Sequence, residues 1–255
     1  MKTDLIRNNT VMKHLKTPLV LLFWLAVWYG VSEIMGMEIL FPSPYSVLNA
    51  FGQLATEKEF YISCFNSLYK VVLGWLAGLL AGVILGIITS LSGIIKALSE
   101  PVLHLIKATP VASFIVLALV LMSSKKVPVF TCALITVPIV WANISEGISS
   151  PDKKLLEMAS FFRMSKKRML KDIYIPAVLP YFSAAAKTAM GLSWKAGIAA
   201  EVICTPSETI GAGIQNAKVY LETPSLFAWT LTVIVLSVAL EKLLGILLKK
   251  HGGVK

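Results

Sequence analysis

Charged residues are scarce in this chain. Asp, Glu, Lys and Arg make up 15% of its 255 residues, against about 25% in an ordinary soluble domain. Hydrophobic residues make up 56% and are gathered in long runs. So little charge excludes an ordinary water-soluble domain and predicts a chain that lies in a lipid bilayer.

The chain also lacks the residue patterns of a catalyst or a metal protein. Cys64, Cys132 and Cys204 are far apart and odd in number, and the three histidines are scattered. We therefore expect free thiols, no metal and no cofactor. No G-x-x-x-x-G-K-[ST] loop occurs, since Lys187-Thr188 has no glycines before it. With no catalytic constellation either, the chain is not expected to be an enzyme.

Six apolar segments are long enough, or nearly so, to cross a bilayer as helices of about 20 residues. The third is short, and it is expected to start near Val102 with a kink at Pro110. The N-terminal residues are polar and no signal-cleavage site follows, so the first segment is expected to be an anchor. The segments are 18–35, 68–91, 109–122, 127–144, 178–202 and 226–248.

Lys and Arg are distributed unevenly between the two sides of these segments. If the N-terminus is inside, seventeen lie inside and five outside, as the positive-inside rule requires. This predicts a cytoplasmic tail at 1–17, one transmembrane domain at 18–248 and a cytoplasmic tail at 249–255. The net charge of +10 is then explained by loops that face the cytoplasm, and nucleic acid is not an expected partner.

Small residues form a ridge on the second segment. Gly74, Gly78, Gly82 and Gly86 recur every fourth residue, so they lie on one face of a helix and allow another helix to approach closely. Two interpretations remain open. The ridge packs inside one subunit, or it lines a subunit interface or moving pathway.

A basic loop at 146–177 separates the fourth and fifth segments. Ser150 and Pro151 predict the start of a helix, with an apolar stripe at Leu155, Leu156, Ala159 and Phe162. A turn is expected near Met164, followed by a second helix that Ser165 caps and Pro176 ends. From these residues alone, an amphipathic hairpin bound to anionic lipid is one interpretation.

The same loop resembles the "EAA" loop of the membrane subunits of ABC importers. Glu157, Ala159, Ile173 and Pro176 are in register with that pattern, whereas Met158, Arg163 and Ile175 replace its Ala, Gly and Leu. The resemblance implies a coupling helix that docks on an ATPase. Its contact residues would be Glu157, Met158, Ala159, Phe162, Arg163, Met164 and Ser165. Because Arg does not readily adopt a positive φ, we expect a more open or shifted turn.

Three further segments resemble the permeases of the nitrate, sulfonate and taurine importer class. They are Phe41-Pro42-Ser43-Pro44, the stretch from Ser193-Trp194-Lys195-Ala196 to Ala200-Glu201, and Gly211-Ala212-Gly213. The resemblance implies an all-α, type I importer permease with six spans in the bacterial cytoplasmic membrane. It also implies an ATPase dimer, an extracytoplasmic substrate-binding protein and a second permease copy as partners.

Lysines inside the fifth segment are its least expected feature. Charge within a bilayer is expensive and usually faces protein or water. Lys187 and Lys195 either snorkel or pair with Glu146 or Glu201, or they line a pathway suited to an anionic solute. The full set of pathway candidates is Lys187, Ser193, Trp194, Lys195 and Glu201.

The rival to an ATP-driven importer is an ion-coupled secondary transporter or a structural membrane subunit. A proton relay would require carboxylates at mid-membrane, where the sequence offers lysines instead. Glu33 and Glu241 lie near segment ends and are expected at the membrane interface.

Overall fold

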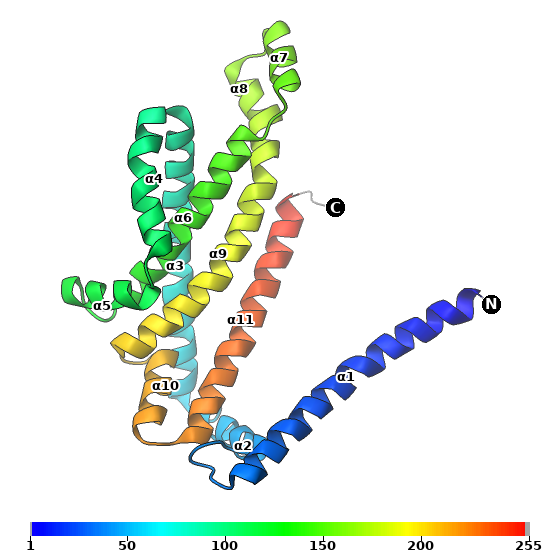
Figure 1. The fold of residues 1–255 in the computed structure, drawn as a ribbon, viewed down its shortest axis with the longest axis vertical. Coiled ribbons are helices and arrows are strands. Elements are labelled where there is room, and N and C mark those ends of the chain that lie inside the picture. Colours follow the sequence, from blue (N-terminus) through cyan, green and yellow to red (C-terminus); the bar gives the residue numbers. More distant parts are fainter. Residues whose placement is uncertain (1, 253–255) are drawn as a thin grey trace. The chain divides into compact units, whose positions relative to one another are not determined.

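The computed structural model describes the backbone of residues 2–252 and the side chains of residues 18–248. The predicted tails, 1–17 and 249–255, therefore lie outside the described side chains. Every regular element in the described part is helical (Figure 1). The elements are α1 (Lys2–Met35), α2 (Pro44–Leu54), α3 (Lys58–Leu91), α4 (Gly93–Ala108), α5 (Val111–Leu121), α6 (Val127–Ser149), α7 (Lys153–Phe161), α8 (Lys166–Met169), the π-helix η1 (Leu170–Tyr174), α9 (Ile175–Cys204), α10 (Ile210–Val219) and α11 (Thr223–Gly252).

The chain forms two compact units. The first contains residues Met1–Phe60 and Ile214–Leu231, and the second contains Tyr61–Gly213 and Thr232–Lys255. In the first unit, the Phe41–Pro44 segment has a clear structural role. Trp28 Nε1 donates to the Pro42 carbonyl at 3.1 Å, and Ser43 caps α2 with Pro44 in its first turn. The motif therefore turns the chain from α1 into α2.

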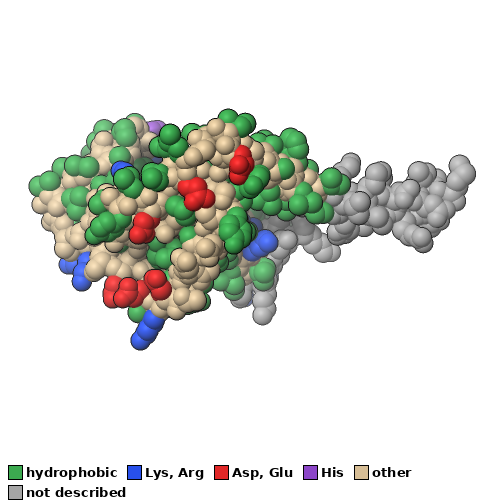
Figure 2. Space-filling model, turned by 90° about the horizontal axis from the view of Figure 1, so that it is seen from below, with side chains coloured by type: hydrophobic (Ala, Val, Ile, Leu, Met, Phe, Trp, Pro, Cys, Tyr) green, Lys and Arg blue, Asp and Glu red, His purple; other side chains and the backbone are tan. Residues whose placement is uncertain are grey.

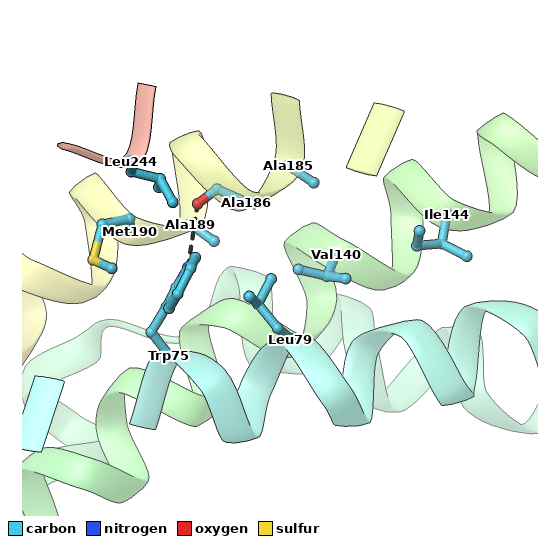
Figure 3. Packing of buried hydrophobic residues seen from close by; sticks show 9 residues of the cluster. All are labelled: Trp75, Leu79, Val140, Ile144, Ala185, Ala186, Ala189, Met190 and Leu244. Atoms are coloured by element: carbon cyan, nitrogen blue, oxygen red, sulfur yellow. Dashed lines mark hydrogen bonds between the residues drawn. The ribbon is translucent and has the colours of Figure 1, made fainter. Parts of the chain in front are cut away.

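The second unit is built on α3, α6 and α9. A core cluster joins Trp75 and Leu79 of α3 to Val140 and Ile144 of α6 and to small residues of α9 (Figure 3). The Trp75 indole donates to the carbonyl of Ala186 at 3.2 Å, so this buried polar group is satisfied.

The four ridge glycines of α3 lie against α6. A Cβ at Gly78 would be 2.5 Å from Thr136 Cβ, and one at Gly82 would be 2.7 Å from Val140 Cβ. Gly74 and Gly86 meet Cys132 and Ile144 in the same way. The ridge therefore packs within one chain, the first of the two interpretations, and the contact leaves no room for a side chain.

Among the residues that the structure describes, four helices are long and apolar enough to cross a membrane, compared with the six segments predicted. They lie at Pro18–Met35, Lys58–Leu91, Val127–Ser149 and Thr223–Leu248. The expected third span is not one kinked helix, because α4 and α5 meet at 106° and make a fifth span only if they are counted together. Pro110 lies at this break, where it begins α5.

The expected fifth span is α9, which is 30 residues or about 45 Å long. Among the described residues, α9 is not one of the helices that are apolar enough to be counted as a membrane span. The reason is that Lys187, Lys195 and Glu201 lower its hydropathy. Elsewhere, large apolar side chains such as Leu76 and Leu80 of α3 are exposed on outer faces. Figure 2, viewed from the end opposite α7 and α8, shows hydrophobic side chains over much of that face, with acidic ones among them.

Candidate functional site

A helical hairpin, α7 followed by α8, projects beyond the ends of α6 and α9 (Figure 1). The prediction that Ser150 caps its first helix is wrong. Ser150 instead ends α6, where its hydroxyl donates to the Gly147 carbonyl at 2.8 Å. Asp152 caps α7 by accepting from Lys154 N at 2.9 Å, because α6 continues further than the sequence pattern indicates.

The turn between α7 and α8 is tight, contrary to the expectation of an open or shifted turn. Arg163 has a φ of +48°. Met164 N donates to the Ala159 carbonyl, and Arg163 N donates to the Ser160 carbonyl, both at 2.9 Å. This is a Schellman motif, whose left-handed position is usually glycine. Arg163 therefore adopts a conformation that favours glycine, at a cost of about 1–2 kcal/mol.

The second half of the hairpin is continuous with α9. Ser165 caps α8 as predicted, accepting from Arg168 N at 3.4 Å. The prediction that Pro176 ends this helix is wrong, since the helical path passes through η1 and Pro176 falls in the first turn of α9. The wider turns of the π-helix accommodate the missing N–H of the proline.

The tip of the hairpin exposes large apolar side chains. Phe161 is 84% exposed and Phe162 71% exposed, and their rings meet edge to face at 5.5 Å. Met158 and Glu157 are also exposed, whereas Ala159 is buried. The expected stripe therefore does not face one core, because Phe162 is exposed whereas Ala159 is buried. Phe161 was not predicted as a site residue, although its place next to Phe162 was a signal.

The five pathway candidates on α9 separate into two groups. Ser193, Trp194 and Glu201 are buried against neighbouring helices. Ser193 shares a hydrogen bond with the Thr136 hydroxyl at 2.8 Å, and the Trp194 indole donates to the Val233 carbonyl at 3.1 Å. These contacts give both residues a packing role. Lys187 and Lys195, by contrast, are exposed.

Glu201 joins α3, α9 and α10. One of its carboxylate oxygens, Oε2, accepts from the Ser67 hydroxyl at 2.7 Å and from Gly211 N at 3.2 Å. Ser67 in turn accepts from Ile210 N at 3.0 Å. A Cβ at Gly211 would collide with Glu201, which explains a glycine there. The Ala-Glu and Gly-x-Gly segments noted in the sequence therefore meet in space.

Lys187 and Lys195 line a cavity of about 490 Å³ between α9 and α11. Among the described side chains, neither lysine forms an ion pair within 4.0 Å, so of the three alternatives the structure does not show pairing with Glu146 or Glu201. Glu241, which was expected at the membrane interface, lines this cavity together with Thr188 and Gly191. Gly191, midway between the two lysines, is a sequence signal that could have indicated this cavity. The residues that α11 contributes could not have been predicted, because they depend on tertiary packing.

The described residues contain no group of three or more His, Cys, Asp or Glu that could hold a metal ion. Cys64, Cys132 and Cys204 are free, as predicted.

Comparison with known proteins places these features in one family. Residues 78–251 match the family of the binding-protein-dependent transport system inner membrane component. The putative aliphatic sulfonates transport permease protein SsuC of Escherichia coli is 30% identical over 222 residues, which cover 86% of this chain and 81% of that protein. The nitrate import permease protein NrtB of Synechococcus elongatus is 25% identical over 209 residues, covering 78% and 75%.

Solved structures show the same fold at lower identity. The chain aligns with a bacterial ABC transporter involved in the import of the acidic polysaccharide alginate, with a TM-score of 0.65 and 13% identity, over 96% of this chain and 97% of that one. An amino acid ABC transporter with histidines gives a TM-score of 0.64 and 17% identity, over 78% and 97%.

The family match covers more than half of the chain, and it agrees with the all-helical membrane architecture. Proteins of this family are non-enzymatic transport subunits that work with an ATPase and a substrate-binding protein. The chain belongs to the binding-protein-dependent transport system inner membrane components and is a multi-pass permease subunit of an ABC importer.

Proposed function

We propose that the α7–α8 hairpin docks on the ATPase subunit and passes its motion to the solute pathway through α9. The observation that carries this proposal is the unbroken helical path from α8 through η1 into α9. A displacement of the hairpin must move the start of α9, because no flexible loop lies between them. The same helix carries Lys187 and Lys195.

The exposed side chains of the hairpin suit a protein partner. Phe161, Phe162 and Met158 form an apolar tip beyond the ends of the long helices. Exposed aromatic groups of this kind mark interaction sites, and buried aromatic anchors supply much of the energy of an interface. Glu157 is an exposed acidic group on a loop that carries more Lys and Arg than Asp and Glu, and it would face a basic group of the ATPase.

Two copies of the chain would form the pathway, since each copy supplies one hairpin and an ATPase dimer has two ATP sites. ATP binding would draw the two hairpins together and favour an outward-facing pathway, while hydrolysis would return it to the inward-facing state. This is alternating access, which requires different contacts in the two states. Both chain termini and the hairpin would face the cytoplasm, as the excess of Lys and Arg there indicates.

The solute is proposed to be small and anionic. The unpaired Lys187 and Lys195 support this, because an ammonium group at membrane depth needs water, a carboxylate or an anion. Two relatives are named for nitrate and for aliphatic sulfonates, and both kinds of solute are anions. The identity of the solute would be selected mainly by the binding protein.

The docking proposal is tested with the Phe162→Ser variant of the complete importer in liposomes. Loss of an aromatic anchor costs about 2 kcal/mol or more at an interface hot spot, which is roughly a 30-fold weaker association with the ATPase. Phe65→Ser is the matched control, because Phe65 is similarly exposed but lies on α3. Glu157→Lys should abolish solute-stimulated ATP hydrolysis, whereas Glu146→Lys, also an exposed acidic position, should not.

Unchanged ATPase association and stimulation in both Phe162→Ser and Glu157→Lys would overturn the docking role. Loss of binding to anionic liposomes by the isolated permease in these variants, with ATPase coupling intact, would instead assign the hairpin to the lipid surface.

A further inference from the structure

The cavity between α9 and α11 is held open by packing at its borders. On one side the Trp194 indole is fixed to the Val233 carbonyl of α11. On the other, Leu244 of α11 is buried in the cluster that contains Met190 of α9. The two helices are thus anchored to each other, and the space of about 490 Å³ between them is in the range of small-molecule sites.

Three charged groups line this space. Lys187 and Lys195 lie on the same face of α9, and their eight-residue separation is about 12 Å along the helix axis. Glu241 lies across from them on α11. No ion pair within 4.0 Å joins Glu241 to either lysine. The lining therefore carries two positive charges and one negative charge, a net charge of +1.

Gly191 sets the position of the carboxylate. It lies one turn from Lys187 and one turn from Lys195, and a Cβ at this position would be 3.3 Å from Glu241 Oε1. The carboxylate therefore approaches the α9 backbone between the two lysines. A larger side chain at position 191 would displace it and fill the floor of the cavity.

We propose that this cavity is a subsite for a small monoanion, such as a sulfonate, and that Glu241 sets its charge preference. The oxyanion group of the ligand is attracted to the ammonium groups of Lys187 and Lys195, with the Thr188 hydroxyl as a further donor, while the Glu241 carboxylate between the lysines repels a second negative charge. One negative charge from the ligand neutralises the net charge of the lining, whereas a dianion is disfavoured by Glu241. This inference rests on the proposed function, because it places the subsite on the pathway of the importer.

The test uses two thiol reagents of similar size and opposite charge. They are 2-sulfonatoethyl methanethiosulfonate and 2-(trimethylammonium)ethyl methanethiosulfonate, applied to the purified permease–ATPase complex in nanodiscs. The target is Thr188→Cys in a background of Cys64→Ser and Cys204→Ser. Cys132 is retained because it is buried. For each cysteine variant, the reaction rate with the anionic reagent is divided by the rate with the cationic reagent. This ratio is then divided by the same ratio for 2-mercaptoethanol, which corrects for the intrinsic reactivity of the two reagents.

The normalised ratio should exceed one in Thr188→Cys. A unit charge at about 6 Å in water changes each rate about threefold, and the ratio about tenfold. Added Lys187→Met should therefore lower the ratio about tenfold, added Lys195→Met should lower it by a smaller factor because Lys195 is about 10 Å further along the helix, and added Glu241→Gln should raise it. A cysteine at exposed Ser207, next to Glu208, is the control and should give a ratio at or below one.

A ratio near one in Thr188→Cys, or one that Lys187→Met and Lys195→Met leave unchanged, would overturn the subsite. The measurement requires no ATP hydrolysis, so its failure is distinct from a failure of hairpin docking. Uptake of the binding-protein ligand is then measured in liposomes. Reduced uptake in Lys187→Met, in a complex that is still recovered intact by size-exclusion chromatography, places the subsite on the pathway, and unchanged uptake excludes it from the pathway.

Discussion

Replacing Gly82 by alanine is the sharpest test of the α3–α6 contact. The added Cβ would lie 2.7 Å from Val140 Cβ and 2.9 Å from the Val137 carbonyl oxygen. Carbon atoms in contact prefer about 3.5–4.0 Å, so α3 and α6 would have to separate by about 1 Å. Overpacking of this kind costs about 1–3 kcal/mol.

Helix propensity acts in the opposite direction, and a control is needed to separate the two effects. Alanine is favoured over glycine by about 1 kcal/mol in a helix interior. Gly30 lies within α1, and a Cβ added to it would have no atom within 4 Å, so Gly30→Ala reports propensity alone. We expect Gly82→Ala to be less stable than Gly30→Ala by about 2 kcal/mol, which is roughly 6 °C in Tm.

The assay is thermal denaturation of the purified complex, followed by size-exclusion chromatography of the surviving fraction. Gly82→Leu should be worse than Gly82→Ala and should prevent recovery of the complex, because a large side chain cannot be accommodated where backbones touch. A Gly82→Ala protein as stable as Gly30→Ala would refute the argument, since it would show that the two helices separate at no cost.

Other predictions test the turn, the buried carboxylate and the topology. Arg163→Gly should raise thermal stability by about 1 kcal/mol, because glycine adopts a φ of +48° without strain; a lower Tm would argue against a strained turn. Ser67→Ala should lower the stability of the complex by about 1–3 kcal/mol, because the Glu201 carboxylate and the Ile210 amide would each lose a buried hydrogen bond. Ser90→Ala should be nearly neutral, because Ser90 bonds only to a carbonyl of its own helix. Equal effects of the two would remove the network's role. A cysteine replacing Lys167 should react with impermeant maleimide only from the cytoplasmic side and one replacing Glu222 only from outside, and the reverse would invert the proposed orientation.

Local motifs were the part of the structure that the sequence predicted well. Ser165 caps its helix, and the four-residue glycine period places one face of α3 against another helix. In each case the signal lies within a few residues, and its geometry follows from the helical repeat.

Errors arose where a local preference was overruled by packing. The sequence rule that arginine avoids a positive φ failed at Arg163, since two backbone hydrogen bonds of the Schellman motif hold that conformation. Pro176 did not end its helix, because the π-helix before it removed the need for an amide hydrogen at that position. The break at Pro110 was recognised as a kink, but its angle of 106° depends on the contacts of the two helices.

The sequence by itself determined that this chain is a helical membrane protein, and the spacing of its Glu157 loop indicated the importer family. Both are properties of composition and of order along the chain. Only the tertiary structure decided which residues of α9 are buried and which face a cavity, because that depends on the helices packed around it. It placed Glu201 against Ser67 and Gly211, and it brought Glu241 opposite Lys187 and Lys195. Residues so far apart in sequence carry no mutual signal in their spacing, and only the packing of their helices brings their charges together.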